Sequence, residues 1–159
     1  MDRESLLGYA RKAAEYAYAP YSHFRVGAAV VVTTGTGERV VTAANVENAS
    51  LGLTLCAERA ALAAVMAQAD APSMQDSSKL EMPAITQVAV ACIDAPEQAD
   101  VATRMPCGAC RQWLAELAPA AEYYVDGVEG TLSLNDLLPN AFRLASVPAS
   151  GSDYEMSRS

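Results

Sequence analysis

The chain opens with a helical pattern of apolar residues that gives way to strand-like runs. Six apolar positions within residues 3–18 have the spacing of one helix face, which predicts an amphipathic helix there. Pro20 closes that segment. Two runs of β-branched residues, at 26–33 and 39–43, flank a short stretch with two glycines and predict an antiparallel hairpin.

The remainder of the chain alternates helical and strand patterns. Residues 56–68 are rich in alanine and leucine and contain no glycine or proline, which predicts a buried helix. An almost continuous apolar run at 85–93 predicts a buried strand. We expect three shorter elements after it: a helix at 107–117, a strand at 122–125 and one helical turn at 134–138. This order favours an α/β fold in which helices cover both faces of a mixed sheet.

Length and composition fit a single domain. The chain has 159 residues, of which 52% are hydrophobic, enough for one sizeable core. We expect this domain to span residues 1–148, with a surface loop at 69–83 and a polar, flexible C-terminal tail at 149–159. The sequence shows no apolar run long enough for a membrane span and no signal peptide, so we expect a cytoplasmic location.

The charge balance restricts the partners. There are 19 acidic and 11 basic side chains, a formal net charge of −8, and the basic residues form no run. An acidic protein of this kind repels polyanions, so we expect neither a nucleic acid polymer nor a membrane as partner. A small and roughly neutral substrate is the natural alternative. The four cysteines are expected to be reduced thiols, because nothing indicates secretion.

The strongest chemical signal comes from three cysteines and a carboxylate. Cys56 stands two residues before Glu58, and Cys107 and Cys110 form a CxxC motif after a proline. A structural zinc has four protein ligands, whereas a catalytic zinc keeps three and leaves one position open. Three thiols and a spare carboxylate therefore favour a catalytic zinc site. The CxxC motif alone would also fit a redox pair or half of a structural zinc site.

The predicted elements place these cysteines at helix N-termini. Cys56 begins one helix and Cys107 the other. Three thiolates on Zn²⁺ leave a net charge of about −1, which the positive ends of two helices offset in part. Arg59 and Arg111 each directly follow a motif residue and are expected to donate hydrogen bonds to the thiolates. Cys92 lies in an apolar strand and is expected to be an inert core thiol.

Four motifs resemble those of the homotetrameric zinc-dependent cytidine deaminases. They stand at residues 19–29 (APYSHFRVGAA), 45–48 (NVEN), 56–59 (CAER) and 106–112 (PCGACRQ). A fifth and weaker match is LLPNAF at 137–142. The two cysteine motifs are common to zinc deaminases with a cysteine first ligand, whereas the first two are more particular to nucleoside deamination. The resemblance implies a three-layer α/β/α fold with a mixed five-stranded sheet.

The resemblance also implies a reaction. Cys56, Cys107 and Cys110 would bind one Zn²⁺ per subunit, and Glu58 would be the general acid and base that carries protons from water to the ring and to the leaving ammonia. The amide of Ala57 or the carbonyl of Cys107 would orient the pyrimidine base of the substrate. The implied reaction is the hydrolytic deamination of cytidine and deoxycytidine to uridine and deoxyuridine in pyrimidine salvage.

Four further residues match positions that contact the nucleoside in this family. Phe24 would pack beside the pyrimidine, and Asn45 and Glu47 would hold the ribose 3′-hydroxyl. Phe142 would come from a neighbouring subunit of a homotetramer with shared active sites. Simpler interpretations stay open: Phe24 and Phe142 would pack in the core of their own chain, and Asn45 and Glu47 would cap a turn and carry a solvated charge.

One residue departs from the family pattern. Many relatives carry an aromatic residue, usually tyrosine, near the 5′ end of the sugar, where this chain has Leu51. A deaminase of a modified cytosine nucleoside such as blasticidin S, which shares the cysteine motifs, is therefore an alternative. A zinc or thiol protein without catalytic activity is a second alternative. Away from the motifs, Trp113 and Tyr124 are expected to pack in the core.

Overall fold

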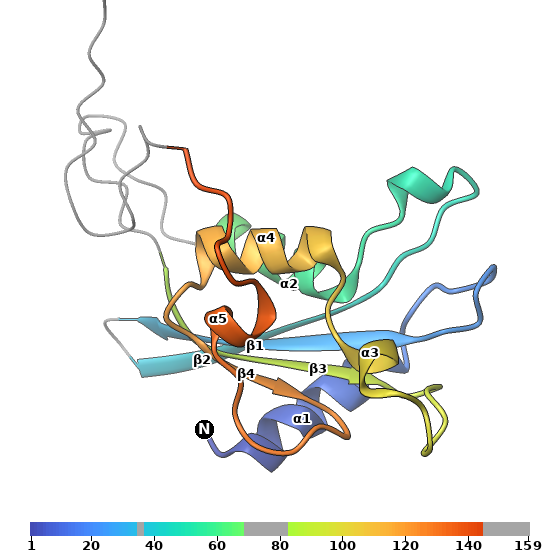
Figure 1. Ribbon diagram of the computed structural model, residues 1–159, viewed down its shortest axis with the longest axis horizontal. Helices are drawn as coiled ribbons and strands as arrows, with labels where there is room; N and C mark the ends of the chain where they lie inside the picture. Colours follow the sequence, from blue (N-terminus) through green and yellow to red (C-terminus); the bar gives the residue numbers. More distant parts are fainter. Residues whose placement is uncertain (35–36, 69–82, 145–159) are drawn as a thin grey trace, which may run out of the picture.

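The computed structural model describes residues 1–34, 37–68 and 83–144, and it confirms the predicted order of helices and strands (Figure 1). The loop predicted at 69–83, apart from Pro83, and the tail at 149–159 lie outside the described residues. The elements are α1 (Arg3–Ala14), β1 (Val26–Thr34), β2 (Gly37–Ala44), the 3-10 turn η1 (Leu51–Leu53), α2 (Ala57–Ala67), β3 (Ala84–Cys92), α3 (Val101–Arg104), α4 (Gly108–Leu117), β4 (Glu122–Val125) and α5 (Leu134–Leu137).

The strands form one mixed sheet in the order β2-β1-β3-β4. β1 pairs antiparallel with both β2 and β3, and β3 pairs parallel with β4. The expectation of five strands is wrong, because the described chain forms a sheet of four. After β4 the backbone returns to the sheet at the isolated bridge between Tyr123 and Leu132. Ser133 then caps α5 in a capping box with Asp136, so the chain turns away before a fifth strand forms.

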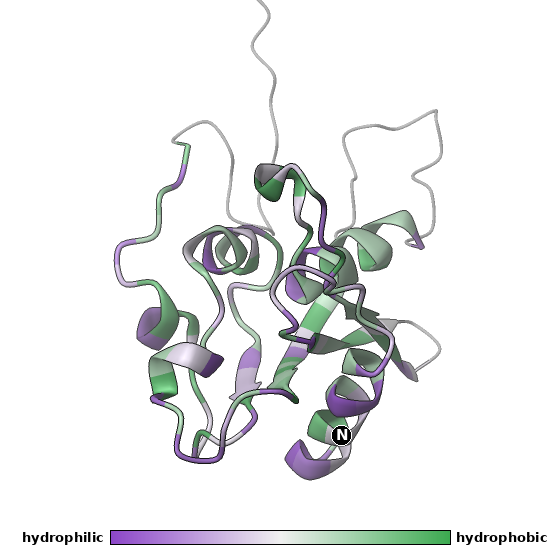
Figure 2. Cartoon of the chain, turned by 90° about the vertical axis from the view of Figure 1, so that its right-hand side faces the viewer, coloured by the Kyte–Doolittle hydropathy of each residue, from purple (hydrophilic) through white to green (hydrophobic). Residues whose placement is uncertain are grey.

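Helices cover both faces of the sheet, as the sequence predicts (Figure 1). Side chains alternate along β1: Ala29 and Val31 pack in the cluster that includes α1, whereas Val30 and Val32 pack in the cluster with α2 and α4. Figure 2 shows mainly hydrophobic colours in the sheet and bands of both colours along α1, the mark of an amphipathic helix. The two sides of the sheet therefore have separate cores.

Helix α1 is shorter than its apolar pattern predicts, since it ends at Ala14 and not at residue 18. The Tyr18 amide donates to the carbonyl of Asn45 at 3.0 Å, and its own carbonyl accepts from the Glu47 amide at 2.8 Å. This pairing with a distant segment replaces the last helical turn. Gly27 in β1 faces α1 so closely that a Cβ atom there would collide with the helix backbone.

The short helix α3 was not predicted. The side chain of Asp100 accepts a hydrogen bond from the Ala102 amide at 2.8 Å, and α3 has no buried residue. Local capping defines this helix, so no periodic apolar pattern reveals it. Over the ranges that the structure describes, no helix is both long and apolar enough to cross a membrane.

Candidate active site

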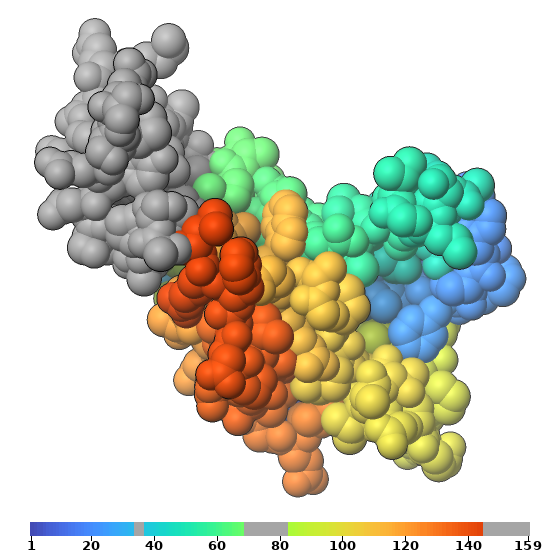
Figure 3. All heavy atoms as spheres, turned by 45° about the horizontal axis from the view of Figure 1, so that its top comes forward, coloured from blue at the N-terminus to red at the C-terminus, as the bar shows by residue number. Residues whose placement is uncertain are grey.

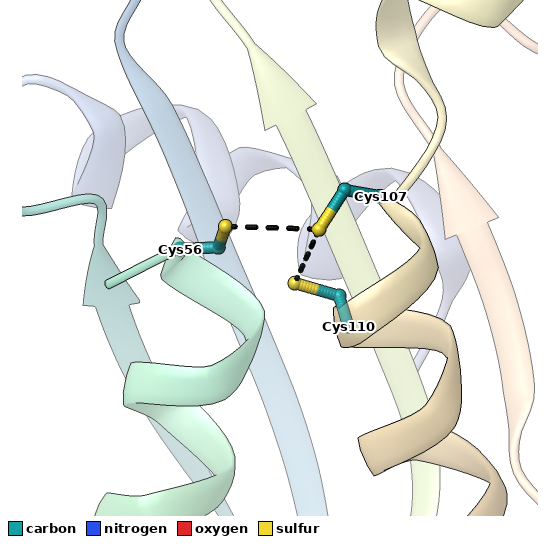
Figure 4. Close-up of side chains that lie close together, drawn as sticks. All are labelled: Cys56, Cys107 and Cys110. Atoms are coloured by element: carbon teal, nitrogen blue, oxygen red, sulfur yellow. Dashed lines mark hydrogen bonds between the residues drawn. The ribbon is translucent and has the colours of Figure 1, made fainter. Parts of the chain in front are cut away.

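Three cysteine thiols meet where α2 and α4 begin (Figure 4). Cys56 immediately precedes α2, Cys107 immediately precedes α4, and Cys110 lies in the first turn of α4. The Sγ atom of Cys107 lies 3.8 Å from that of Cys56 and 3.5 Å from that of Cys110. All three sulfur atoms lie within 4.8 Å of one another. The fold therefore brings the predicted ligands together from two separate motifs.

This spacing fits a single zinc ion. With Zn–S bonds of about 2.3 Å, a tetrahedral ion holds two sulfur ligands about 3.8 Å apart. The two measured separations of 3.8 and 3.5 Å agree with that value. No other cluster of three or more cysteine, histidine or acidic side chains has ligand spacing within the described part of the chain. Three thiol ligands leave one position of a tetrahedral ion open, which is typical of a catalytic zinc.

The thiols of Cys56 and Cys110 do not ionise equally. The neighbouring Cys110 thiol lowers the pKa of Cys56 to about 5, and the Arg59 guanidinium acts in the same direction. The pKa of Cys110 is raised, because it contacts Cys56 and is buried. Of these two thiols, Cys56 therefore ionises first, at the positive end of α2. A zinc ion bound here would displace the remaining thiol protons, since thiols bind metals as thiolates.

The two arginines beside the ligands have different partners. Arg59 Nη2 lies 3.7 Å from Cys56 Sγ and donates to the carbonyl of Thr54 at 2.9 Å, so it supports the thiolate as expected. Arg111 donates instead to the carbonyls of Pro106 and Leu137, both at 2.7 Å. It ties the segment before α4 to α5. The structure thus places Arg111 as a brace behind the ligands, not as a donor to sulfur.

Glu58 lies in the first turn of α2 and is only 4% exposed. Burial raises the pKa of its carboxyl group, and the charge of Cys56 adds to the effect. A carboxyl group with a raised pKa is suited to take up and release protons near neutral pH. Ala57, whose amide is expected to orient the substrate, is fully buried between Cys56 and Glu58.

Three of the other predicted contact residues, Phe24, Asn45 and Glu47, lie around one loop. Half-buried Phe24 precedes β1, and the side-chain amide of Asn45 donates to its carbonyl at 3.1 Å. The Asn45 Oδ1 atom accepts from the Val26 amide at 2.9 Å. The Glu47 carboxylate accepts from the amide of Ser22 at 3.2 Å and from its hydroxyl, and the hydroxyl lowers the pKa of Glu47. Asn45 and Glu47 therefore brace the Phe24 loop, whatever further contacts they make.

Several apolar side chains are left open to solvent. Phe142 is 68% exposed, so it does not pack in the core of its own chain. With Met66, Trp113 and Leu144 it lines a hollow of about 700 Å³ beside α2 and α4. Trp113 is 41% exposed, which corrects the expectation that it packs in the core. Leu51 is 74% exposed on the loop that projects beside the segment before β1 (Figure 3).

One polar contact near Phe24 was not foreseen from the sequence. Asp94 accepts a hydrogen bond from the backbone amide of Arg25 and pairs with its guanidinium. The only signal for it is its position, an acidic residue just after a buried strand. Cys92 and Tyr124 are buried, as predicted, and burial raises the pKa of Cys92 to about 11, so this thiol stays protonated.

Comparison with known proteins agrees with this site. The model of the cytidine and deoxycytidylate deaminase zinc-binding region matches residues 1–125. A cytidine deaminase of Halalkalibacterium halodurans is 40% identical over 146 residues, which are 89% of this chain and 95% of that protein. A cytidine deaminase of Mycobacterium tuberculosis is 40% identical over 148 residues, which are 93% of this chain and 95% of that protein.

Solved structures give the same result for the fold. The crystal structure of a cytidine deaminase from Burkholderia pseudomallei superposes with a TM-score of 0.68 at 39% identity, and covers 89% of this chain and 100% of that one. The crystal structure of the enzyme from Mycobacterium tuberculosis gives a TM-score of 0.67 at 36% identity, over 91% of this chain and 99% of that one.

Proposed function

The chain belongs to the family of cytidine and deoxycytidylate deaminases that share this zinc-binding region, and we propose that it hydrolyses cytidine and deoxycytidine to uridine and deoxyuridine. The observation that carries this proposal is the cluster of three thiols at two helix N-termini with the buried carboxyl group of Glu58 beside it. The relatives named above are cytidine deaminases, and nothing among them favours an antibiotic such as blasticidin S as substrate.

The chemistry divides between the metal and Glu58. Cys56, Cys107 and Cys110 would hold the zinc ion, which would supply Lewis acidity that makes water reactive near neutral pH. Glu58 accepts a proton from the attacking water and delivers it to N3 of the pyrimidine ring. It then transfers the second proton to the departing amino group, which leaves C4 as ammonia. One water is consumed, and the carboxyl group of Glu58 returns to its starting state.

We assign recognition of the nucleoside to Phe24 in the loop before β1 and to Asn45 and Glu47, the two side chains that hold this loop. Phe24 packs against the pyrimidine, and Asn45 and Glu47 bind the ribose 3′-hydroxyl. A carboxylate accepts several hydrogen bonds, so Glu47 retains capacity for a sugar hydroxyl beyond its contacts with the loop. Its negative charge also disfavours a 5′-phosphate, which supports nucleosides rather than nucleotides as substrates.

The assembly proposed for this protein is a homotetramer whose subunits share active sites. The support is the 68% exposure of Phe142, which in this arrangement reaches the site of a neighbouring subunit. Exposed Leu51 and Trp113 would be covered in the same contact. We place the enzyme in the cytoplasm and in pyrimidine salvage, because its substrates are intracellular nucleosides and its cysteines are unpaired.

The experiment that tests this function combines zinc quantification with turnover. Purified protein is given cytidine, deoxycytidine, free cytosine and blasticidin S, and loss of the cytosine absorbance is followed. Glu58→Gln is expected to keep its zinc and fold but to lose about 10³-fold in kcat, because general acid–base catalysis contributes about that much. Near-normal kcat in this variant would exclude the assigned role, and turnover of blasticidin S alone would exclude the substrate.

A further inference from the structure

The backbone around Phe24 is held by hydrogen bonds on both sides. The Phe24 amide donates to the Ser22 hydroxyl at 3.1 Å, and its carbonyl accepts from Asn45. The amide of Val26 donates to Asn45 Oδ1 at 2.9 Å, and its carbonyl accepts from the Asn45 amide at 3.0 Å. On this side, which faces β2, Asn45 binds the backbone on either side of Arg25, at Phe24 and at Val26. The matching contact on the β3 side comes from another residue.

That residue is Asp94, two positions beyond the end of β3. The Arg25 carbonyl accepts from the Ile93 amide at 3.1 Å, as in an antiparallel ladder. In such a ladder the Arg25 amide would donate a second hydrogen bond to a backbone carbonyl of the opposite strand. Here the amide donates to Asp94 Oδ2 at 2.8 Å instead. The side chain of Asp94 therefore takes the place of a strand carbonyl and continues the pairing one residue further, to the neighbour of Phe24.

The same carboxylate also holds the side chain of Arg25. Arg25 Nε lies 2.9 Å from Asp94 Oδ2, and Nη2 lies 2.7 Å from Oδ1, which is the two-pronged geometry of a strong arginine–carboxylate pair. The Arg25 contact lowers the pKa of Asp94, so the carboxylate is ionised at neutral pH. Arg25 is thus bound to Asp94 through both its backbone and its side chain.

From this geometry we propose that Asp94 is a positioning residue for the deamination reaction. By holding Arg25, it fixes the neighbouring Phe24 in the position where its ring contacts the pyrimidine. The inference rests on the proposed role of Phe24 in substrate binding. Asn45 holds Phe24 from the β2 side and Asp94 holds its neighbour from the β3 side, so the loss of either lets the loop shift. The zinc ligands and Glu58 lie on other segments and stay in place.

The test compares KM and kcat for cytidine in Asp94→Ala and Asp126→Ala. Asp126 is a matched control, because it pairs with Arg11 through the same two-pronged contact, at 2.8 and 2.7 Å, but supports α1 on the other face of the sheet. We expect Asp94→Ala to raise KM about fivefold, the effect of losing one ordinary hydrogen bond, with kcat and zinc content nearly unchanged. Asp126→Ala is expected to lower the melting temperature and leave KM unchanged.

Two further variants separate this inference from the proposed function. Asp94→Asn retains an oxygen that accepts from the Arg25 amide, so its KM is expected to lie between those of wild type and Asp94→Ala. In the double variant with Phe24→Ala, KM is expected to rise little beyond that of Phe24→Ala alone, because both changes act on one contact.

Each outcome bears on one of the two claims. If Phe24→Ala raises KM and Asp94→Ala does not, the inference is overturned while the proposed function stands. An additive double variant also overturns it, since Asp94 then acts by another route. If Phe24→Ala leaves KM unchanged, the proposed role of Phe24 is wrong, and the inference with it. Absence of cytidine turnover in the wild-type protein would overturn the proposed function itself.

Discussion

The thiol cluster and the nucleoside-facing region differ in how complete they are within one chain. Cys110 is buried, Glu58 is 4% exposed, and the three sulfur atoms already have the spacing that zinc requires. Phe142 and Leu51, in contrast, are 68% and 74% exposed. The hollow that Phe142 lines lies beside α2 and α4 and does not include the cysteines.

The three thiols and Glu58 thus come together within one chain, whereas the proposed assembly leaves part of the nucleoside site to a neighbouring subunit. Two helix N-termini fix the ligands, because each cysteine belongs to the cap or the first turn of a helix that packs on the sheet. Exposed aromatic and leucine side chains that gather in a patch mark a surface for contact with a partner. In the proposed tetramer, a neighbouring subunit is that partner.

The largest effect is expected from removing a zinc ligand. Cys107→Ser should lose bound zinc and fall below detectable turnover, because a hydroxyl is a much poorer zinc ligand than a thiolate. Metal content by atomic absorption and kcat for cytidine measure both losses. Cys92→Ala is the matched control, since Cys92 is buried outside the cluster and should keep zinc and activity. Normal zinc content in Cys107→Ser would mean that the cluster is not the metal site.

The thiol cluster was also the part most readily predicted from the sequence. Its motifs are short and lie at the starts of helices. Once each helix start is known, the spacing from Cys56 to Glu58 and from Cys107 to Cys110 determines where these side chains lie on the first helical turn. Features set by distant pairing were missed. The Arg25–Asp94 contact joins residues 69 positions apart, and it carries no periodic signal. Helix α1 ends early because Tyr18 pairs with the strand-like segment around Val46, which no local pattern shows.

Two further predictions, a buried Trp113 and a fifth strand, failed for a similar reason. Trp113 follows the apolar spacing of α4 but is 41% exposed at the rim of the hollow. Apolar spacing alone does not distinguish a helix face that packs in the core from a helix face that another molecule covers. The five-stranded sheet was inferred from resemblance. It is absent from the described residues because the Ser133 capping box ends the pairing after Leu132.

An intermediate effect is expected at Phe142. Phe142→Ala should raise KM for cytidine about tenfold, because an aromatic contact contributes up to about 1.5 kcal/mol beyond its buried area. If Phe142 serves a neighbouring subunit, dissociating and reassembling Phe142→Ala together with Glu58→Gln creates some sites with both native residues. A component with wild-type KM should then appear in the mixture. If it does not, or if sedimentation gives a clean monomer, the nucleoside region is complete within one chain, as the thiol cluster is.

The smallest effect is expected at Leu51, in the exposed part of the nucleoside-facing region. Leu51→Tyr adds a hydroxyl at the position where the resemblance places the 5′ end of the sugar, and one such hydrogen bond is worth about 1 kcal/mol. We therefore expect KM for cytidine to fall about fivefold, while KM for 5′-deoxycytidine, which lacks the 5′-hydroxyl, changes little. Leu51→Phe supplies the ring without the hydroxyl and should leave the ratio of the two KM values at the wild-type level. An equal change for both nucleosides in Leu51→Tyr would show that the ring acts by packing. The 5′-hydroxyl would then be recognised by other residues, and the exposed Leu51 would belong to a subunit contact and not to the substrate.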